Sequence, residues 1–432
     1  MLTLRDAVAV VGETGDTDRT ERPGDLALPS SVDETLDVSG CVVTPGLVNA
    51  HHHLLQSAFR TLPGTRGVTM RDWLPAMATA YGRAGHDPEM YGLAASVGAA
   101  EGLLCGVTTV ADHHLNWPHD ASVEATVELA AATVAAVRSV GQRLVFVRGS
   151  ARDDAAWAAA SAEAIVEALL PGAPKGVSAD GMLQLAIGPA GAHSDGPETF
   201  AALRDVAVRH GLRRRTQANE QVDTAIALER YGRRPIDLLD EWGWLEPGVT
   251  IAHLCDVTDD EIDRLADAGV TATHAPGCDV PMGWGVAPVA KLLAAGIPTG
   301  LGTSGGGSND AGHLLADARL ALQVSGLVGP QLPARTVLDM ATAGSAAGLG
   351  RADIGHLGVG TAGDACVWDV SGVADAGIAD PVAGLLWGSP GRRPRHVIAG
   401  GRVVVRDYRL TQVDEHELVA RLRERLRRTP PA

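Results

Sequence analysis

The chain has 432 residues, of which 45% are hydrophobic and 20% charged, enough to build a large buried core. Its formal net charge of −16, with no basic patch to reverse it, argues against binding to nucleic acid or an anionic membrane. The start of the chain lacks a leader pattern, no run of about 18 apolar residues occurs, and the five cysteines are widely spaced, so we expect a soluble cytoplasmic protein without a disulfide framework.

Short strand patterns with turns mark both ends of the chain, at residues 2–11, 365–372 and 396–407. Neither end is long enough to fold alone, so we expect 1–45 and 355–410 to combine into one small β-sandwich. The polar stretch 12–31 carries Gly and Pro and reads as a loop. Residues 411–432 read as a basic amphipathic helix with a tail.

Between these ends, eight strand patterns alternate with helical patterns such as 122–141 and 197–211. Such alternation indicates βαβ units, and eight of them predict a closed TIM barrel over residues 46–354. Polar residues cluster where the strands end, which is where TIM barrels carry their catalytic groups. The strand patterns cover 41–53, 106–114, 143–150, 183–189, 212–220, 248–255, 269–277 and 297–308.

The strongest local motif is PGLVNAHHHLLQ at residues 45–56. His51 and His53 are two positions apart at a strand end, so both side chains point to the same side. Imidazole nitrogen is a good ligand for zinc and similar divalent ions. An isolated pair of this kind could also be a histidine-rich surface turn.

This motif, with TQANE (216–220), IAHL (251–254), GWGVAPV (283–289) and GLGTSGGGSND (300–310), resembles the amidohydrolase superfamily along the whole chain. VTMRDWL (68–74), VADHHLNWP (110–118) and 307–322 are similar to the triazine hydrolases, with the 8-oxoguanine deaminases nearby. The resemblance implies one divalent metal ion that activates water, with zinc as the preferred candidate. It also implies hydrolytic loss of an amino or halide substituent from a heteroaromatic ring.

In that family the fifth strand supplies a histidine ligand and, three residues later, a glutamate that moves protons. The sixth strand supplies another histidine and the eighth an aspartate. This chain keeps Glu220 and His253, but Gln217 replaces the histidine and Ser304 the aspartate. Losing a carboxylate would make the metal-bound water more acidic, whereas losing an imidazole would weaken metal binding. We therefore expect His51, His53 and His253 as ligands, with Gln217 or Ser304 assisting.

Glu220 is the expected general acid and base, and the alternative is an ion pair with an arginine of 213–215. His253 could ligate the metal or polarise the substrate, or it could be an ordinary buried histidine. Several loop residues after the strands could shape the pocket, with core packing as the alternative for each. Tryptophan and methionine suit the faces of a planar ring. These residues are Gln56, Arg60, Trp73, His113, His114, Trp117, Cys278, Asp279, Met282 and Trp284.

Asp279 could bind a ring N–H or an amine, or cap a turn. Residues 308–310 read as a helix start, with Ser308 or Asn309 as the N-cap.

The leading hypothesis is hydrolysis of a C–N bond in a small molecule, by default deamination of a purine-, pterin- or triazine-type ring. One rival is hydrolysis of an amide or amidine in a specialised metabolite or modified peptide. The other is a barrel that has lost metal-dependent hydrolysis and acts as a lyase, a cyclase or a ligand-binding protein. Family resemblance also favours a homodimer.

Overall fold

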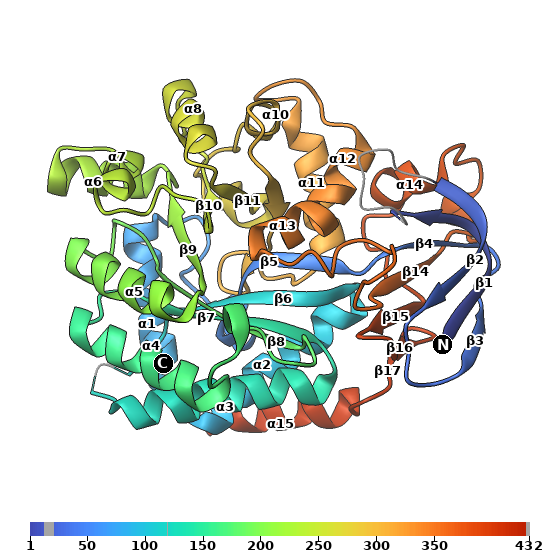
Figure 1. Ribbon diagram of the computed structural model, residues 1–432, viewed down its shortest axis with the longest axis horizontal. Coiled ribbons are helices and arrows are strands. Elements are labelled where there is room, and N and C mark those ends of the chain that lie inside the picture. The colour runs from blue at the N-terminus through green and yellow to red at the C-terminus, as the bar shows by residue number, and fades with distance from the viewer. Residues whose placement is uncertain (13–20, 119, 429–432) are drawn as a thin grey trace.

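A computed structural model describes residues 1–12, 21–118 and 120–428. Its centre is a curled sheet of parallel strands in the order β12-β11-β10-β9-β8-β7-β6-β5-β13 (Figure 1). The predicted strand–helix alternation is confirmed, and the fold is a TIM-like barrel. The strands are β5 (Leu47–His53), β6 (Val107–His114), β7 (Arg143–Ser150), β8 (Leu183–Pro189), β9 (Arg213–Ala218), β10 (Val249–His253), β11 (Thr271–His274), β12 (Thr299–Leu301) and β13 (Ser304–Gly305).

The eighth barrel strand is split into two short pieces, β12 and β13. Through these pieces it pairs with both neighbouring strands and completes the barrel. β12 pairs with β11, whereas β13 pairs with β5 and places Ser304 opposite His52. Gly302 lies between the two pieces, and a side chain there would come within 2.7 Å of the His51 backbone and Cβ. The absence of a side chain therefore lets the eighth strand pass close beside the histidine strand.

Helices surround the barrel strands (Figure 1). Their ends follow local rules: the Ser122 side chain accepts from the Ala125 N–H at the start of α3, and Gly141 ends α3 with φ 94°. They are α1 (Met70–Ala84), α2 (Pro88–Leu104), α3 (Val123–Val140), α4 (Ala155–Leu169), α5 (Pro197–His210), α6 (Val222–Tyr231), α7 (Pro235–Glu241), α8 (Asp259–Asp267), α9 (Pro276–Asp279), α10 (Val289–Ala294), α11 (Leu314–Ser325), α12 (Ala334–Asp339), α13 (Ser345–Leu349), α14 (Pro381–Trp387) and α15 (Glu415–Arg427).

The helix start predicted at residues 308–310 is wrong, because α11 begins at Leu314 with His313 as its N-cap. Ser308 instead donates to the Gly305 carbonyl and Asn309 to the Thr303 carbonyl. Both side chains thereby hold the chain in a turn after β13.

Both ends of the chain combine into one mixed sheet beside the barrel, in the order β17-β16-β15-β14-β4-β1-β2, with β3 paired to β1 (Figure 1). This agrees with the predicted composite β-sandwich, while the exact domain boundaries stay a prediction. The strands are β1 (Leu2–Val11), β2 (Glu21–Leu28), β3 (Glu34–Asp37), β4 (Cys41–Pro45), β14 (Ala365–Asp369), β15 (His396–Ala399), β16 (Arg402–Arg406) and β17 (Arg409–Leu410).

The loop predicted at 12–31 is wrong over Glu21–Leu28, which forms the strand β2; residues 13–20 lie outside the described residues. β2 pairs antiparallel with β1 and buries Leu26 and Leu28. Its Pro and Gly are compatible with an edge strand, where one side of the backbone has no partner strand.

A buried ion pair joins the barrel to the terminal sheet. Arg143 on β7 forms a two-pronged contact with Asp364, which precedes β14, and Asp364 also accepts from the Gly400 N–H at 2.7 Å. The predicted C-terminal helix is α15, which buries Leu418 and Leu422. Across residues 1–12, 21–118 and 120–428, no helix is both long and apolar enough to cross a membrane.

Candidate active site

The predicted site residues come from strand ends on one side of the barrel. His51 and His53 are near the end of β5, Glu220 follows β9 by two residues, and His253 is the last residue of β10. All four side chains are buried. Parallel strands place their carboxyl ends at one edge, which is why residues so far apart in sequence share a site.

The imidazole rings of the predicted ligands form a cluster around His51. Its ring centroid lies 4.9 Å from that of His53 and 5.2 Å from that of His253. His113 from β6 adds a fourth ring, 5.9 Å from His51. The structure therefore brings the three predicted imidazoles together.

Both histidines of β5 have a ring nitrogen free for a further partner. His53 donates from Nδ1 to the His113 carbonyl at 2.7 Å, which leaves the lone pair on Nε2. His51 Nε2 is buried without a hydrogen-bond partner. Burial, followed by the neighbouring histidines, keeps the pKa of His51 well below its usual value. A neutral imidazole with an unpaired nitrogen is the form that binds a metal ion.

His253 is held from both sides. Its Nδ1 lies 2.6 Å from Asp279 Oδ1, and its Nε2 lies 3.1 Å from Gln217 Oε1 and 3.5 Å from Glu220 Oε1. Burial alone would lower the pKa of His253, but the carboxylates of Asp279 and Glu220 raise it to about 9. Although burial opposes it, His253 in turn lowers the pKa of Asp279 to about 2. Asp279 therefore orients His253.

Glu220 is a fully buried carboxyl group whose two oxygens have no hydrogen-bond partner. Burial, with Asp223 and Asp279 adding to it and His253 opposing it, raises the pKa of Glu220 to about 8. The alternative ion pair does not form, because Arg213 and Arg215 donate to the Gly348 carbonyl and Arg214 pairs with Glu246. Glu220 can therefore hold a proton near neutral pH and release it to a group that enters the site.

Left-handed backbone occurs at the strand ends that carry these groups. Asn219 and Gln221, on either side of Glu220, have φ 57° and 67°, while His253 has φ 77° and Ser304 has φ 53°. Such conformations are unfavourable for residues other than glycine and concentrate at functional sites.

The donors suit a divalent metal ion in their chemistry. The free nitrogens of His51 and His53 and the unpaired carboxylate of Glu220 are buried groups that a cation would satisfy. Within the described part of the chain, however, no three His, Cys, Asp or Glu side chains are already set as a metal-binding group. The Nε2 of His253 is already occupied, since it lies 3.1 Å from Gln217 Oε1 and 3.5 Å from Glu220 Oε1.

A cavity of about 460 Å³ opens onto this cluster. Nine of the twelve residues predicted as metal ligands, proton carriers or substrate contacts line it, so most of the predicted site faces one space. These are His53, Gln56, Trp73, Trp117, Gln217, Glu220, Met282, Trp284 and Ser304.

Hydrogen bonds fix several of these wall residues. Trp73 Nε1 donates to the Gly307 carbonyl and Trp117 Nε1 to the Gly149 carbonyl, while Gln56 Oε1 accepts from the Gly307 N–H. Trp284 packs edge-on against His253, with ring centroids 5.2 Å apart. The aromatic wall is therefore rigid and close to the histidine cluster.

Other predicted pocket residues lie behind the wall. Arg60 forms an ion pair with Glu101, and His114 faces Asp112. His113 donates from Nε2 to the Gly188 carbonyl at 2.8 Å. Asp279 is also absent from the wall, whereas Cys278 belongs to it.

Two parts of the cavity were missed by sequence reasoning. His193, after β8, lines the cavity with a buried Nδ1 that has no partner, and burial lowers its pKa to about 4. Met70, Met77 and Tyr81 of α1 form an apolar wall. The signal for His193 was its position after the fourth strand, where a barrel places site residues.

The comparisons with known proteins fit this geometry. Residues 42–404 match the model of the amidohydrolase family. The chain belongs to the amidohydrolase family. It is similar to 8-oxoguanine deaminase of Pseudomonas aeruginosa, with 34% identity over 90% of this chain and 87% of the relative. It is also similar to 5-methylthioadenosine/S-adenosylhomocysteine deaminase of Desulfovibrio desulfuricans, with 31% identity over 88% of this chain and 83% of the relative.

Among solved structures, the amidohydrolase chain is similar to a mutant of atrazine chlorohydrolase TrzN from Arthrobacter aurescens TC1, complexed with zinc and atraton. The TM-score is 0.91 and the identity 31%, covering 99% of this chain and 100% of the other. Both the predicted family and the predicted subgroup are confirmed. The chain is a hydrolase that acts on C–N bonds.

Proposed function

We propose that this amidohydrolase removes an amino group hydrolytically from a heteroaromatic ring. The reaction uses one divalent metal ion, with zinc as the preferred candidate. The observation that carries the proposal is the buried carboxyl of Glu220, which makes no hydrogen bond and faces the cavity beside the histidine cluster. Deaminases of aminated heterocycles among the relatives, and zinc in the structure of the triazine hydrolase, support it.

His51, His53 and His253 would hold the metal ion, with Gln217 or Ser304 completing the set. A bound divalent ion supplies a more acidic water and a positive charge near the reacting atom. His253 would reach the ion by giving up its contact with the Gln217 amide. Asp279 would keep the His253 ring oriented through Nδ1.

Glu220 would move the protons. Its raised pKa leaves much of the carboxyl protonated at neutral pH, and its ionised form can accept a proton from the attacking water. The same carboxyl group would then protonate the leaving amine as ammonia.

Met282 and Trp284 lie next to the histidine cluster and would contact the faces of the planar ring. His193 is neutral and unpaired at Nδ1, so it would hydrogen-bond to the ring edge. A water molecule occupies about 30 Å³ of liquid volume. A cavity of about 460 Å³ therefore has room for a bicyclic ring and a substituent.

The test uses the zinc-loaded full-length chain and measures ammonia released from aminated purines, pterins, pyrimidines and triazines. We expect turnover that a chelator abolishes and zinc restores. Glu220→Gln should lower kcat by about 100-fold or more while zinc content and melting temperature stay the same. The matched control is Glu241→Gln, which changes an exposed glutamate on α7 paired with Arg233.

Retained turnover in Glu220→Gln would remove this carboxyl from the mechanism. Less than about a tenth of a metal ion per chain after loading, with no response to chelator, would favour the metal-free lyase, cyclase or binding protein. Ammonia release only from amides or amidines would favour the other rival.

A further inference from the structure

The turn that carries Glu220 is held by residues that do not face the cavity. Left-handed backbone at Asn219 and Gln221 brackets Glu220, and neither residue is a glycine. A turn of this kind persists only where its surroundings impose it. The question is therefore which contacts impose it.

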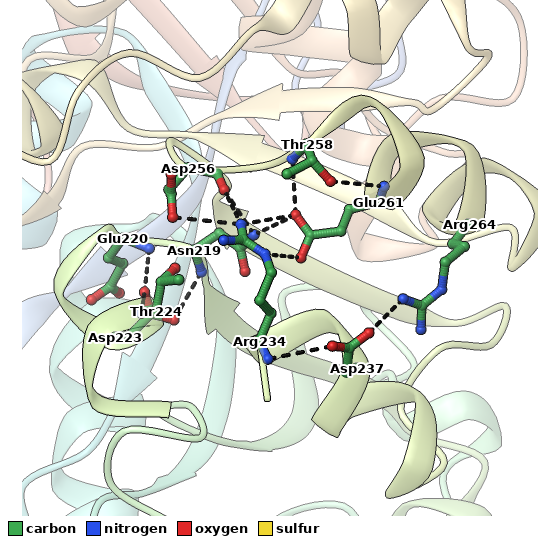
Figure 2. A network of polar contacts seen from close by, with 10 residues as sticks. All are labelled: Asn219, Glu220, Asp223, Thr224, Arg234, Asp237, Asp256, Thr258, Glu261 and Arg264. Carbon is green, nitrogen blue, oxygen red and sulfur yellow. Dashed lines mark hydrogen bonds and ion pairs between the residues drawn. The ribbon is translucent and has the colours of Figure 1, made fainter. Parts of the chain in front are cut away.

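Asp223, in the first turn of α6, provides the first of these contacts. Its fully buried carboxylate accepts from the backbone N–H groups of Asn219 at 2.8 Å, Glu220, and Thr224 at 2.8 Å (Figure 2). These three hydrogen bonds to one carboxylate fix the backbone of the turn that contains Glu220. Hydrogen bonds to a charged acceptor are stronger than those between neutral groups.

The Asn219 side chain provides the second contact, on the opposite side. Its Nδ2 donates to Glu261 Oε2 at 3.1 Å and to the Asp256 carbonyl at 3.2 Å. Glu261 is in turn fixed by Arg234, whose Nε lies 2.8 Å from Oε1, and by the Thr258 N–H at 2.8 Å (Figure 2). The turn is thus tied to both α6 and the start of α8.

We infer that Asp223, assisted by Asn219, is a positioning residue that aims the Glu220 carboxyl at the reacting atoms. This inference rests on the proposed role of Glu220. The Glu220 side chain itself has no hydrogen bond, so its direction is set by its backbone and by packing. The plain alternative is that Asp223 only stabilises the start of α6 and has no bearing on the reaction.

The first measurement is independent of activity. Hydrogen exchange of the segment 216–226 is compared between the wild-type chain and Asp223→Ala, Asp223→Asn and Asn219→Ala. In Asp223→Ala the amides of Asn219 and Glu220 should exchange at least ~10-fold faster, because they lose a charged acceptor. Asp223→Asn keeps one acceptor oxygen and should give an intermediate rate, which also covers the case in which Asp223→Ala fails to fold.

The second measurement is steady-state kinetics of the zinc-loaded variants on the best substrate. Asp223→Ala should lower kcat about 100-fold, as expected for a misplaced reacting group, with KM within about 3-fold. Combined with Glu220→Gln, it should lower the remaining rate no further, because it acts through Glu220. The matched control is Asp414→Asn, which changes a carboxylate that accepts two backbone N–H groups at the start of α15 and should leave kcat unchanged.

Unchanged exchange of the 216–226 segment would overturn the inference, as would faster exchange with wild-type kcat. A further loss of rate in the Glu220→Gln background would assign Asp223 a structural role only. If no compound yields ammonia, the proposed deamination fails separately, and the exchange rates alone decide whether Asp223 holds the turn.

Discussion

Replacing Asp279 with asparagine removes one charge from the site with little change of shape. The Asp279 carboxylate is fully buried, 2.6 Å from His253 Nδ1 through Oδ1 and 3.6 Å from His274 Nδ1 through Oδ2. The amide oxygen of asparagine can still accept from Nδ1–H. The substitution therefore weakens the contact that orients His253 without opening a cavity.

The magnitude follows from that contact. A hydrogen bond to a charged group contributes roughly 1.5–3 kcal/mol, and a neutral one about 1 kcal/mol. Losing the charge should therefore cost about 0.5–2 kcal/mol, which is roughly 2- to 30-fold in affinity or rate. This range overlaps the 10- to 100-fold that removal of a partner behind a ligating histidine typically costs.

Two assays test this prediction for Asp279→Asn. Competition with a chromophoric chelator measures the zinc dissociation constant, which should rise roughly 2- to 30-fold. Ammonia release measures kcat/KM at saturating zinc. Asp267→Asn, on the exposed end of α8, is the control for a lost carboxylate. Zinc affinity and kcat/KM both within about 2-fold of wild type, in a correctly folded variant, would refute the orienting role.

Three further substitutions test other parts of the molecule. Gln217→His should tighten zinc binding at least ~10-fold, because imidazole is a better zinc ligand than an amide oxygen; equal affinity would show that this position does not reach the metal. Asp364→Ala should cost about 3–5 kcal/mol of unfolding free energy, since it leaves the Arg143 cation buried and unpaired. Calorimetry should show a smaller loss for the double replacement Arg143→Met with Asp364→Leu. Burial raises the pKa of Asp317 well above its usual value, so its ionised form destabilises the fold at higher pH. Asp317→Asn should therefore increase the free energy of unfolding at pH 8 by about 1 kcal/mol or more, and raise the melting temperature accordingly. That advantage should shrink as the pH falls and the wild-type carboxyl becomes protonated; a pH-independent difference would contradict the reasoning.

The barrel was predictable because its signal repeats. The eight strand patterns are short and alternate with helical patterns, so an error in one would not change the architecture. The errors lie where the signal is local. β2 has Pro and Gly within eight residues and is a strand only because it pairs with β1. The turn after β13 has helix-start residues, but they bond to carbonyl groups of the preceding turn.

The site was predictable where chemistry and strand ends coincide, as for His51, Glu220 and His253. It was less predictable where a side chain could face either way. Asp279 follows the seventh strand and suited a substrate contact, yet its carboxylate faces His253 and not the cavity. That direction follows from the contact between Asp279, at the end of α9, and His253, at the end of β10, two residues far apart in sequence. The position of Arg234 depends similarly on a contact with Glu261 of α8, far away in sequence, for which sequence spacing has no signature.

The free energy spent on burial and backbone strain at the site also favours hydrolysis over the metal-free rival functions. Burying the Glu220 carboxyl without a hydrogen bond costs about 1–3 kcal/mol, and each left-handed residue around it, such as Asn219 and Gln221, adds about 1–3 kcal/mol. A barrel that only bound a ligand would be more stable with these groups paired or replaced. The chain differs from the expected ligand set at Gln217 and Ser304, yet it has a strained turn at the proposed proton carrier, Glu220, and a buried Asp279–His253 pair. Strain retained around a carboxyl that must accept and release protons is what general acid–base catalysis requires.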